Sequence, residues 1–313
     1  MPSRTSQPPR AQTPPHCPGC SSETELAYHT HDYNQRNLRE QFTWYRCRQC
    51  RQLFLDPVPA DLGPYYSQAY YAIPPSLHEL AQAAARKQYQ IELVRQFVAG
   101  GRLLDIGPGH GAFAYLAKQA GFDVTTIELD AGCCQILRDV VGVTTIQSDD
   151  PASVLPTLRP QRVITLWHVI EHLRDPWECL ARAAARLEPG GILLVAAPNP
   201  DALQFRLLGA RWVHLDAPRH VNLLPAPLLA SRLAQQGLQP LLVTTNDPGG
   251  LALNRYGWRA SLLNCSERRW PRAAAWRLGA PLGLLASPLE RLGLRGSAYT
   301  AIFRKPVEAP IPH

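Results

Sequence analysis

The feature that most constrains this chain is an apolar run that ends in an acidic residue and a glycine turn. Residues 103–111 read LLDIGPGHG, with glycines at 107, 109 and 111, and a helical pattern follows them. Glycine lets a backbone approach a ligand where a Cβ would block it, and the helix start adds unpaired amides. In a dinucleotide site the third glycine comes one position later, and the pyrophosphate would repel Asp105. The turn therefore favours a ligand that presents an ammonium group to Asp105.

Strand-like and helix-like segments alternate from Gly101 onward, and no internal repeat is present. The strand-like runs are 102–106, 123–128, 143–147, 162–167, 191–198, 240–246 and 297–305. Strands that alternate with helices imply a mostly parallel sheet covered on both faces. The sequence thus predicts an α/β, Rossmann-like fold.

Two further carboxylates stand where a nucleoside would lie. Glu128 ends the second strand-like run, where a carboxylate can accept hydrogen bonds from both ribose hydroxyls. The simpler interpretation of Glu128 is a surface residue at a strand end. Asp149 follows the third run and is expected to accept from an adenine amino group, with Asp150 as a close competitor.

Together with Glu128, LLDIGPGHG, TLWHVIEHLRDP at 165–176 and LEPGGILLVAAPNP at 187–200 resemble the class I S-adenosylmethionine-dependent methyltransferases. The likeness covers about residues 101–245 and is nearest to the small-molecule and sugar-tailoring branch. It implies a seven-stranded methyltransferase sheet with an antiparallel last strand, and S-adenosyl-L-methionine as methyl donor. The residues that it implies for cofactor binding are Asp105, Gly107, Gly109, Gly111, Glu128, Leu129, Asp149 and Trp167.

The run from His168 to His172 spells H-x-x-E-H, which is also a zinc-protease signature. Its place after the fourth strand of a Rossmann-like sheet disfavours a protease. The resemblance puts this run beside the acceptor. Because an imidazole has a pKa near neutrality, His172 is the first candidate for a general base and His168 the second. The alternative is that these histidines only fix the loop by hydrogen bonds.

Residues 211–224, RWVHLDAPRHVNLL, crowd aromatic and polar side chains into one loop. Loops at the carboxyl ends of the strands carry the sites of α/β sheets. We expect Trp212, His214 and Arg219 to contact the substrate, and His220 to be a third catalytic candidate. The alternative is an ordered lid held by its own hydrogen bonds.

Four of the eight cysteines form two C-x-x-C pairs, Cys17/Cys20 and Cys47/Cys50. Two such pairs suit a tetrahedral structural zinc ion. Their separation exceeds the common spacing, but a hairpin formed by YHTHDYN and FTWYRC can absorb it. A closed four-sulfur site predicts a role in folding; the alternative is a redox or catalytic role.

The domain organisation follows from these features. We expect a disordered tail at 1–16, a zinc-ribbon-like module at 17–55, a connector with a helix at 56–100, the donor-binding core at 101–250, a helical insert at 251–296, the last strand at 297–305 and a tail at 306–313. Within the connector, residues 76–97 have a helical pattern.

The insert is predicted to form two or three short helices with one apolar side and one arginine-bearing side. Residues 251–305 hold nine arginines and one lysine against two glutamates, which accounts for the whole net charge of +7. Such a surface suits an anionic membrane or a lipid-linked acceptor. The alternatives are a solvated face, a cap over the acceptor pocket or a dimer contact.

The sequence therefore predicts a cytoplasmic methyltransferase, with peripheral contact to a membrane, that acts on the carbon or oxygen of a small-molecule or glycan/lipid-linked acceptor. One alternative is an RNA-modifying methyltransferase, which the absence of an N/D-P-P-[YF] motif after the fifth strand disfavours, so nucleic acid is not an expected partner. The other is a non-catalytic zinc-bearing scaffold, which the intact glycines, Asp105 and Glu128 oppose.

Overall fold

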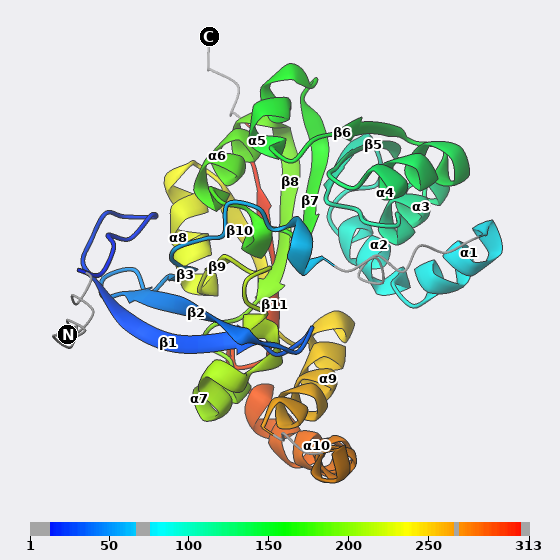
Figure 1. Ribbon diagram of the computed structural model, residues 1–313. Coiled ribbons are helices and arrows are strands. Elements are labelled where there is room, and N and C mark those ends of the chain that lie inside the picture. The colour runs from blue at the N-terminus through cyan, green and yellow to red at the C-terminus, as the bar shows by residue number, and fades with distance from the viewer. Residues whose placement is uncertain (1–12, 67–75, 266–268, 308–313) are drawn as a thin grey trace, which may run out of the picture.

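The computed structural model describes residues 13–66, 76–265 and 269–307, and contains a large and a small sheet (Figure 1). The large sheet has the strand order β10-β11-β8-β7-β4-β5-β6. Its strands are β4 (Arg102–Ile106), β5 (Asp123–Glu128), β6 (Thr144–Gln147), β7 (Gln161–Trp167), β8 (Leu187–Pro198), β10 (Gln239–Thr244) and β11 (Ala298–Arg304). Neighbours are parallel from β6 to β8, whereas β11 is antiparallel to β8 and β10. The predicted seven-stranded Rossmann-like fold is confirmed.

Helices cover both faces of this sheet (Figure 1). The helices are α1 (Leu77–Ala85), α2 (Gln88–Arg95), α3 (Ala112–Gln119), α4 (Ala131–Ile136), α5 (Pro151–Val154), α6 (Pro176–Arg186), α7 (Leu203–Leu208), α8 (Ala226–Gln235), α9 (Pro248–Asn264) and α10 (Arg269–Glu290). Successive strand residues face opposite sides. Leu103 packs in the cluster with α1, α2 and α3, and Leu104 packs in the cluster with α6 and α8. Burial of both faces explains why the central strands are largely apolar.

Residues 76–97 form two helices rather than one. The backbone N–H of Lys87 donates to the carbonyl of Ala84, three residues earlier, at 2.8 Å. This tighter hydrogen bond ends α1. Leu80 on α1 and Ile91 on α2 lie in the same buried cluster beneath the sheet. Because of the break at 86–87, the apolar faces of α1 and α2 both pack on the same core.

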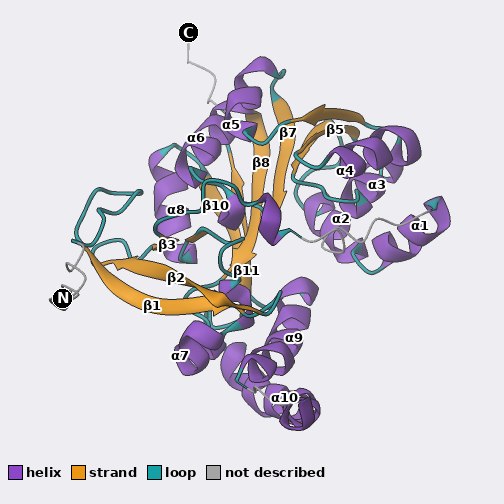
Figure 2. Cartoon of the chain, viewed as in Figure 1, coloured by secondary structure: helices purple, strands orange, loops and turns teal. Residues whose placement is uncertain are grey.

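The small sheet has four antiparallel strands in the order β1-β2-β3-β9 (Figure 2). These are β1 (Thr24–Asp32), β2 (Asn37–Cys47), β3 (Leu53–Leu55) and β9 (Asn222–Leu223). The hairpin β1–β2 contains the two segments expected as strands. Strand β9 lies near the end of the loop at 211–224. Trp44 and Trp212 lie in one buried cluster. The N-terminal module and this loop therefore share a sheet and a core.

The insert before β11 consists of two helices, α9 and α10, which pack against each other and are longer than expected (Figure 1). Glu290 at the end of α10 is buried and accepts hydrogen bonds from Gln204 Nε2 at 2.8 Å and Trp258 Nε1 at 3.0 Å. These bonds tie α10 to α7 and α9. Among the described residues, no helix combines the length and apolar content needed to cross a bilayer.

Candidate active site and cysteine centre

A cavity of about 910 Å³ opens at the carboxyl ends of the central strands of the large sheet. It lies where ligands bind in open α/β folds. Gly107, Gly109, Glu128, Leu129, Asp149, His168 and His172 line it, and these residues belong to both the predicted donor site and the predicted acceptor site. Three other residues of the expected donor set, Asp105, Gly111 and Trp167, are not among the lining residues.

The glycine turn has the backbone conformation that its sequence predicts. Gly107, Gly109 and Gly111 have φ values of 66°, 57° and 83°, in the left-handed region that side chains disfavour. A Cβ at Gly107 would lie 2.5 Å from Val169 Cγ2, whereas a Cβ at Gly109 would meet nothing within 4 Å. The turn is thus packed from behind at Gly107 and leaves open space at Gly109, where a ligand can approach the backbone.

Asp105 lies buried near the end of β4, and one of its carboxyl oxygens has no hydrogen-bond partner among the described residues. Its Oδ1 accepts a hydrogen bond from Thr165 Oγ1 at 2.7 Å, but its Oδ2 has no partner among the described residues. Burial raises the pKa of this carboxyl from 3.8 to about 7, against the lowering effects of Thr165 and of the nearby charge of Lys87. A buried carboxylate with an unsatisfied oxygen is costly unless a cation or donor meets it. Asp105 therefore fits the ammonium group of a methionine moiety.

Glu128 ends β5 and holds the glycine turn in place. Its Oε2 accepts from the backbone N–H of Gly109 at 2.9 Å, and its Oε1 accepts from those of Leu129 and Asp130 at 2.9 Å each. Burial raises the pKa of Glu128, although these three N–H groups lower it. Each carboxylate oxygen has two lone pairs, so capacity remains for ligand hydroxyls at the cavity wall. Leu129 and Asp149, both exposed, continue this wall.

Trp167, the last residue of β7, packs edge-on against Phe113 and Tyr89. Its indole Nε1 is buried without a hydrogen-bond partner among the described residues. This ring supports the floor behind the glycine turn.

On the acceptor side, a glutamate lies among three histidines. Glu171 is buried, and its Oε1 lies 3.6 Å from His168 Nδ1 and 4.0 Å from His220 Nε2. The rings of His172 and His220 meet edge-on with centroids 4.7 Å apart. His168 has a φ of 57°, which is uncommon outside glycine and often occurs at functional sites. Two of these histidines, at 168 and 172, reach the cavity.

The protonation of this cluster follows from burial and neighbouring charge. Burial, together with the nearby charge of His220, lowers the pKa of His172 to about 4. His172 is therefore neutral at neutral pH. Burial alone would raise the pKa of Glu171, but the nearby side chain of His168 and the other surrounding imidazoles lower it.

The three residues expected to contact the substrate do not line the cavity. Trp212 is 1% exposed within the small core, and the half-buried His214 packs edge-on against it. Arg219 is fully buried, and its guanidinium forms ion pairs with Asp32 and Asp216. In this structure the loop packs into the small core and against β1, and these three side chains do not face the cavity. Asp32 carries no signal in the sequence, because it is an ordinary strand residue 187 positions before its partner.

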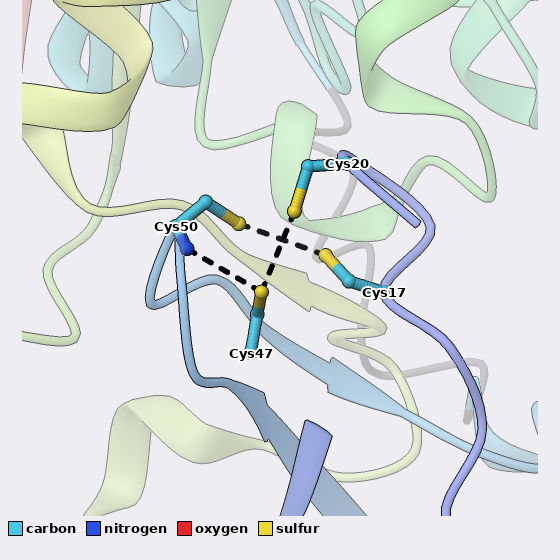
Figure 3. Close-up of side chains that lie close together, drawn as sticks. All are labelled: Cys17, Cys20, Cys47 and Cys50. Atoms are coloured by element: carbon cyan, nitrogen blue, oxygen red, sulfur yellow. Dashed lines mark hydrogen bonds between the residues drawn. The ribbon is translucent and has the colours of Figure 1, made fainter. Parts of the chain in front are cut away.

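The four paired cysteines converge at the end of the small sheet that adjoins β3 (Figure 3). Cys17 Sγ lies 3.6 Å from Cys50 Sγ, and Cys20 Sγ lies 3.5 Å from Cys47 Sγ. All four sulfur atoms lie within 4.8 Å of one another. Zinc–sulfur bonds of about 2.3 Å in a tetrahedron place the sulfurs about 3.8 Å apart, so the cluster has the size of a four-thiolate zinc site.

Comparison with known proteins agrees with this geometry. A family model described as a methyltransferase domain matches residues 67–243, more than half of the chain. A ubiquinone biosynthesis O-methyltransferase from Bordetella avium (strain 197N) is 30% identical over 152 residues, which are 45% of this chain and 63% of that relative. One from Xanthomonas euvesicatoria pv. vesicatoria (strain 85-10) is 25% identical over 181 residues, 54% of this chain and 74% of the relative.

The chain thus spans a little under two thirds of the length of the first of these relatives. A solved structure from Galdieria sulphuraria, proposed to be a sarcosine dimethylglycine methyltransferase, matches 78% of this chain and 97% of its own with a TM-score of 0.52. At 16% identity this likeness supports the fold alone. The family model, the strand order and the glycine turn lead to one conclusion: the chain belongs to the class I S-adenosylmethionine-dependent methyltransferases.

Proposed function

We propose that this protein transfers a methyl group from S-adenosylmethionine to a hydroxyl oxygen of a small-molecule acceptor. The observation that carries the proposal is that one cavity is lined both by the glycine turn with Glu128 and by His168 with His172. Donor and acceptor can therefore meet without water between them. The relatives named as ubiquinone biosynthesis O-methyltransferases support oxygen as the methylated atom.

On the donor side, the free Oδ2 of Asp105 receives the ammonium group, and the turn at Gly107, Gly109 and Gly111 accommodates the methionine moiety. Glu128 binds the ribose with the one lone pair of Oε2 that its three backbone hydrogen bonds leave free. Leu129 covers the adenine and Asp149 accepts from its amino group, while Trp167 supports the turn from behind. S-adenosylmethionine supplies a methyl group already activated by the sulfonium, so the protein mainly aligns the reactants.

On the acceptor side, His168 is the general base of this proposal. Its side chain is 38% exposed and reaches the cavity, and Glu171 behind it stabilises the imidazolium. His172, the stronger candidate from sequence, is a poor base because its pKa lies near 4. The acceptor O–H bond breaks toward His168, a new O–CH₃ bond forms, and the donor sulfur keeps the electron pair of its broken bond.

His172 and His220 form the buried side of the acceptor pocket, and Trp212, His214 and Arg219 fix its wall. The cysteines at 17, 20, 47 and 50 hold a structural zinc ion that stabilises the same wall through the shared sheet.

A finer part of the proposal concerns where the acceptor resides. Helix α10 exposes several leucines, among them Leu284 at 72% and Leu285 at 76%. The insert also carries arginines, and Arg259 of α9 stacks over the partly exposed Trp276 of α10. Exposed leucines in an arginine-rich insert suit the surface of an anionic membrane, so we propose a lipid-linked acceptor reached from that surface.

Isothermal titration with S-adenosylhomocysteine tests the donor site. We expect micromolar binding by the wild type and at least a tenfold loss in Asp105→Ala and in Glu128→Ala, because each removes a charged ligand contact. Glu188→Ala, at the opposite end of the sheet, is the control. A hydroxylated-acceptor panel with detection of released S-adenosylhomocysteine then tests the transfer. Absence of binding by the folded wild type would refute the proposal.

A further inference from the structure

Among the described residues, Glu171, His172 and His220 form a second cluster of possible metal ligands, apart from the four cysteines. One ligand atom from each residue lies within 4.8 Å of the others. Glu171 and His172 come from the turn after β7, and His220 comes from the lid that precedes β9. The backbone N–H of Val221 donates to the carbonyl of Glu171 at 2.8 Å, which fixes the two segments together.

The hydrogen bonds of the two imidazoles decide which nitrogen faces the cluster. His172 Nδ1 lies 3.0 Å from the carbonyl oxygen of Arg219, and His220 Nδ1 lies 2.8 Å from that of His214. A carbonyl oxygen only accepts, so each Nδ1 carries the proton and each neutral ring has its lone pair on Nε2. A histidine that donates Nδ1–H to a backbone carbonyl and presents Nε2 is the usual arrangement of a metal ligand.

The carboxylate completes the set. Glu171 is 1% exposed, and its Oε2 has no hydrogen-bond partner among the described residues. Its nearest imidazole nitrogens, at 3.6 Å and 4.0 Å from Oε1, are too distant for good hydrogen bonds. A buried carboxyl group without sufficient donors is expensive, and a cation between the three side chains removes that cost. Asp216 does not compete, because Arg219 and Asn34 donate to it.

We propose that Glu171, His172 and His220 bind a divalent transition-metal ion, such as Zn²⁺, Fe²⁺, Mn²⁺ or Co²⁺, in the acceptor wall. Two imidazoles and one carboxylate suit these ions and leave coordination positions open. The ligand atoms of a tetrahedral ion lie about 3.4 Å apart, so the side chains draw together by about an ångström on binding. His172 lines the cavity, so an open position faces the acceptor.

The role of this ion rests on the proposed O-methylation. The ion binds the acceptor hydroxyl as a Lewis acid and lowers its pKa, and the proton passes to His168. The resulting oxyanion attacks the donor methyl group, and the donor sulfur retains the bonding electron pair. The site thus selects acceptors whose reacting group is a hydroxyl able to coordinate a metal.

Titration of the full-length, metal-free protein with Co²⁺ tests the site. Cobalt bound to thiolates has an intense sulfur-to-metal charge-transfer band, whereas cobalt bound to nitrogen and oxygen has none, so the two centres are distinguishable. We expect two Co²⁺ per wild-type chain, one with the band and one without. Glu171→Gln, which keeps the side-chain shape, loses the second ion or binds it at least tenfold more weakly.

Glu188→Gln is the matched control and keeps both ions. Circular dichroism and S-adenosylhomocysteine binding report whether each variant is folded with an intact donor site. A wild-type chain that binds cobalt only at the thiolate centre, or a Glu171→Gln chain that binds both ions unchanged, overturns the metal site. Loss of donor binding with two ions retained instead refutes the proposed methyl transfer and leaves the metal site standing.

Discussion

Arg219 and Asp32 form a buried, two-pronged ion pair between the lid and the first strand of the small sheet. Nη1 donates to Oδ2 at 2.9 Å and Nη2 donates to Oδ1 at 2.6 Å, and neither side chain is more than 1% exposed. The Nε atom of the same guanidinium donates to Asp216. One arginine thus fastens the acceptor wall to the N-terminal module.

Asp32→Asn should lower the free energy of unfolding by about 3 kcal/mol, because removal of one partner leaves a buried charge undercompensated. Urea denaturation followed by tryptophan fluorescence measures the change. Asp123→Asn, at the exposed start of β5, is the control and should change stability by less than about 0.5 kcal/mol. An equal effect of the two substitutions would contradict a structural role for the ion pair.

Asp105→Asn should stabilise the donor-free protein at neutral and higher pH. The pKa of this carboxyl is raised by burial from 3.8 to about 7, so between these values the folded chain holds a proton that the unfolded chain releases. Stability of the wild type therefore falls as the pH rises through this window. The variant should be more stable by about 1–3 kcal/mol near pH 8 and equal to the wild type near pH 4. Thermal unfolding across this range checks it; a pH-independent difference would exclude titration of Asp105 as the cause.

His168→Gln should reduce kcat by roughly 10²–10⁴-fold and leave the affinity for S-adenosylhomocysteine unchanged, because a general base acts on the acceptor only. The acceptor identified by the panel serves as substrate. His78→Gln, on the exposed face of α1, is the control. If His168→Gln retains the wild-type rate and pH profile, another group removes the proton.

Removal of zinc should loosen the lid as well as the cysteine centre. Strand β9 pairs with β3, and β3 follows Cys50 by three residues, so loss of the metal frees the edge on which β9 is bonded. Hydrogen exchange after chelation, or in Cys47→Ser, should show faster exchange at residues 221–223 and little change in β4. If amide protection at 221–223 is retained in the metal-free chain, the pairing of β9 does not depend on the zinc ion.

A double substitution, Leu284→Ser with Leu285→Ser, should reduce sedimentation with anionic phosphatidylglycerol vesicles at low salt by several-fold. These two leucines are the most exposed apolar side chains of α10. The matched control replaces Leu26 and Leu38 of the small sheet, which are also exposed. Wild-type protein that remains in the supernatant under these conditions would rule out the membrane surface.

The donor half of the site could be predicted because its signals are local. A strand, a glycine turn and a helix are consecutive in sequence, so LLDIGPGHG already specifies where Asp105 lies and which backbone is open. Glu128 follows the same logic, since it ends the next strand. Its three backbone N–H partners were not foreseen, because they depend on how the turn folds back over β5.

The acceptor half could be predicted only in part. The sequence identified His168, His172 and His220, but their division into a cavity-facing base and a buried pair depends on contacts between segments some fifty residues apart. The same applies to Arg219, whose partner Asp32 belongs to a strand with no distinguishing pattern. The helical periodicity of the sequence does not reveal the break between α1 and α2, because both helices carry an apolar face of the same kind.

The shared strand β9 has a consequence for the order of synthesis. Both C-x-x-C pairs leave the ribosome early, yet the edge of β3 acquires its neighbour only when residues 222–223 have emerged. At ordinary translation rates that delay is on the order of ten seconds or more. Throughout it the nascent module has an unpaired strand edge, the kind of surface on which other chains can add. Production of this protein therefore depends on how well the growing polypeptide is shielded until residues 222–223 have emerged.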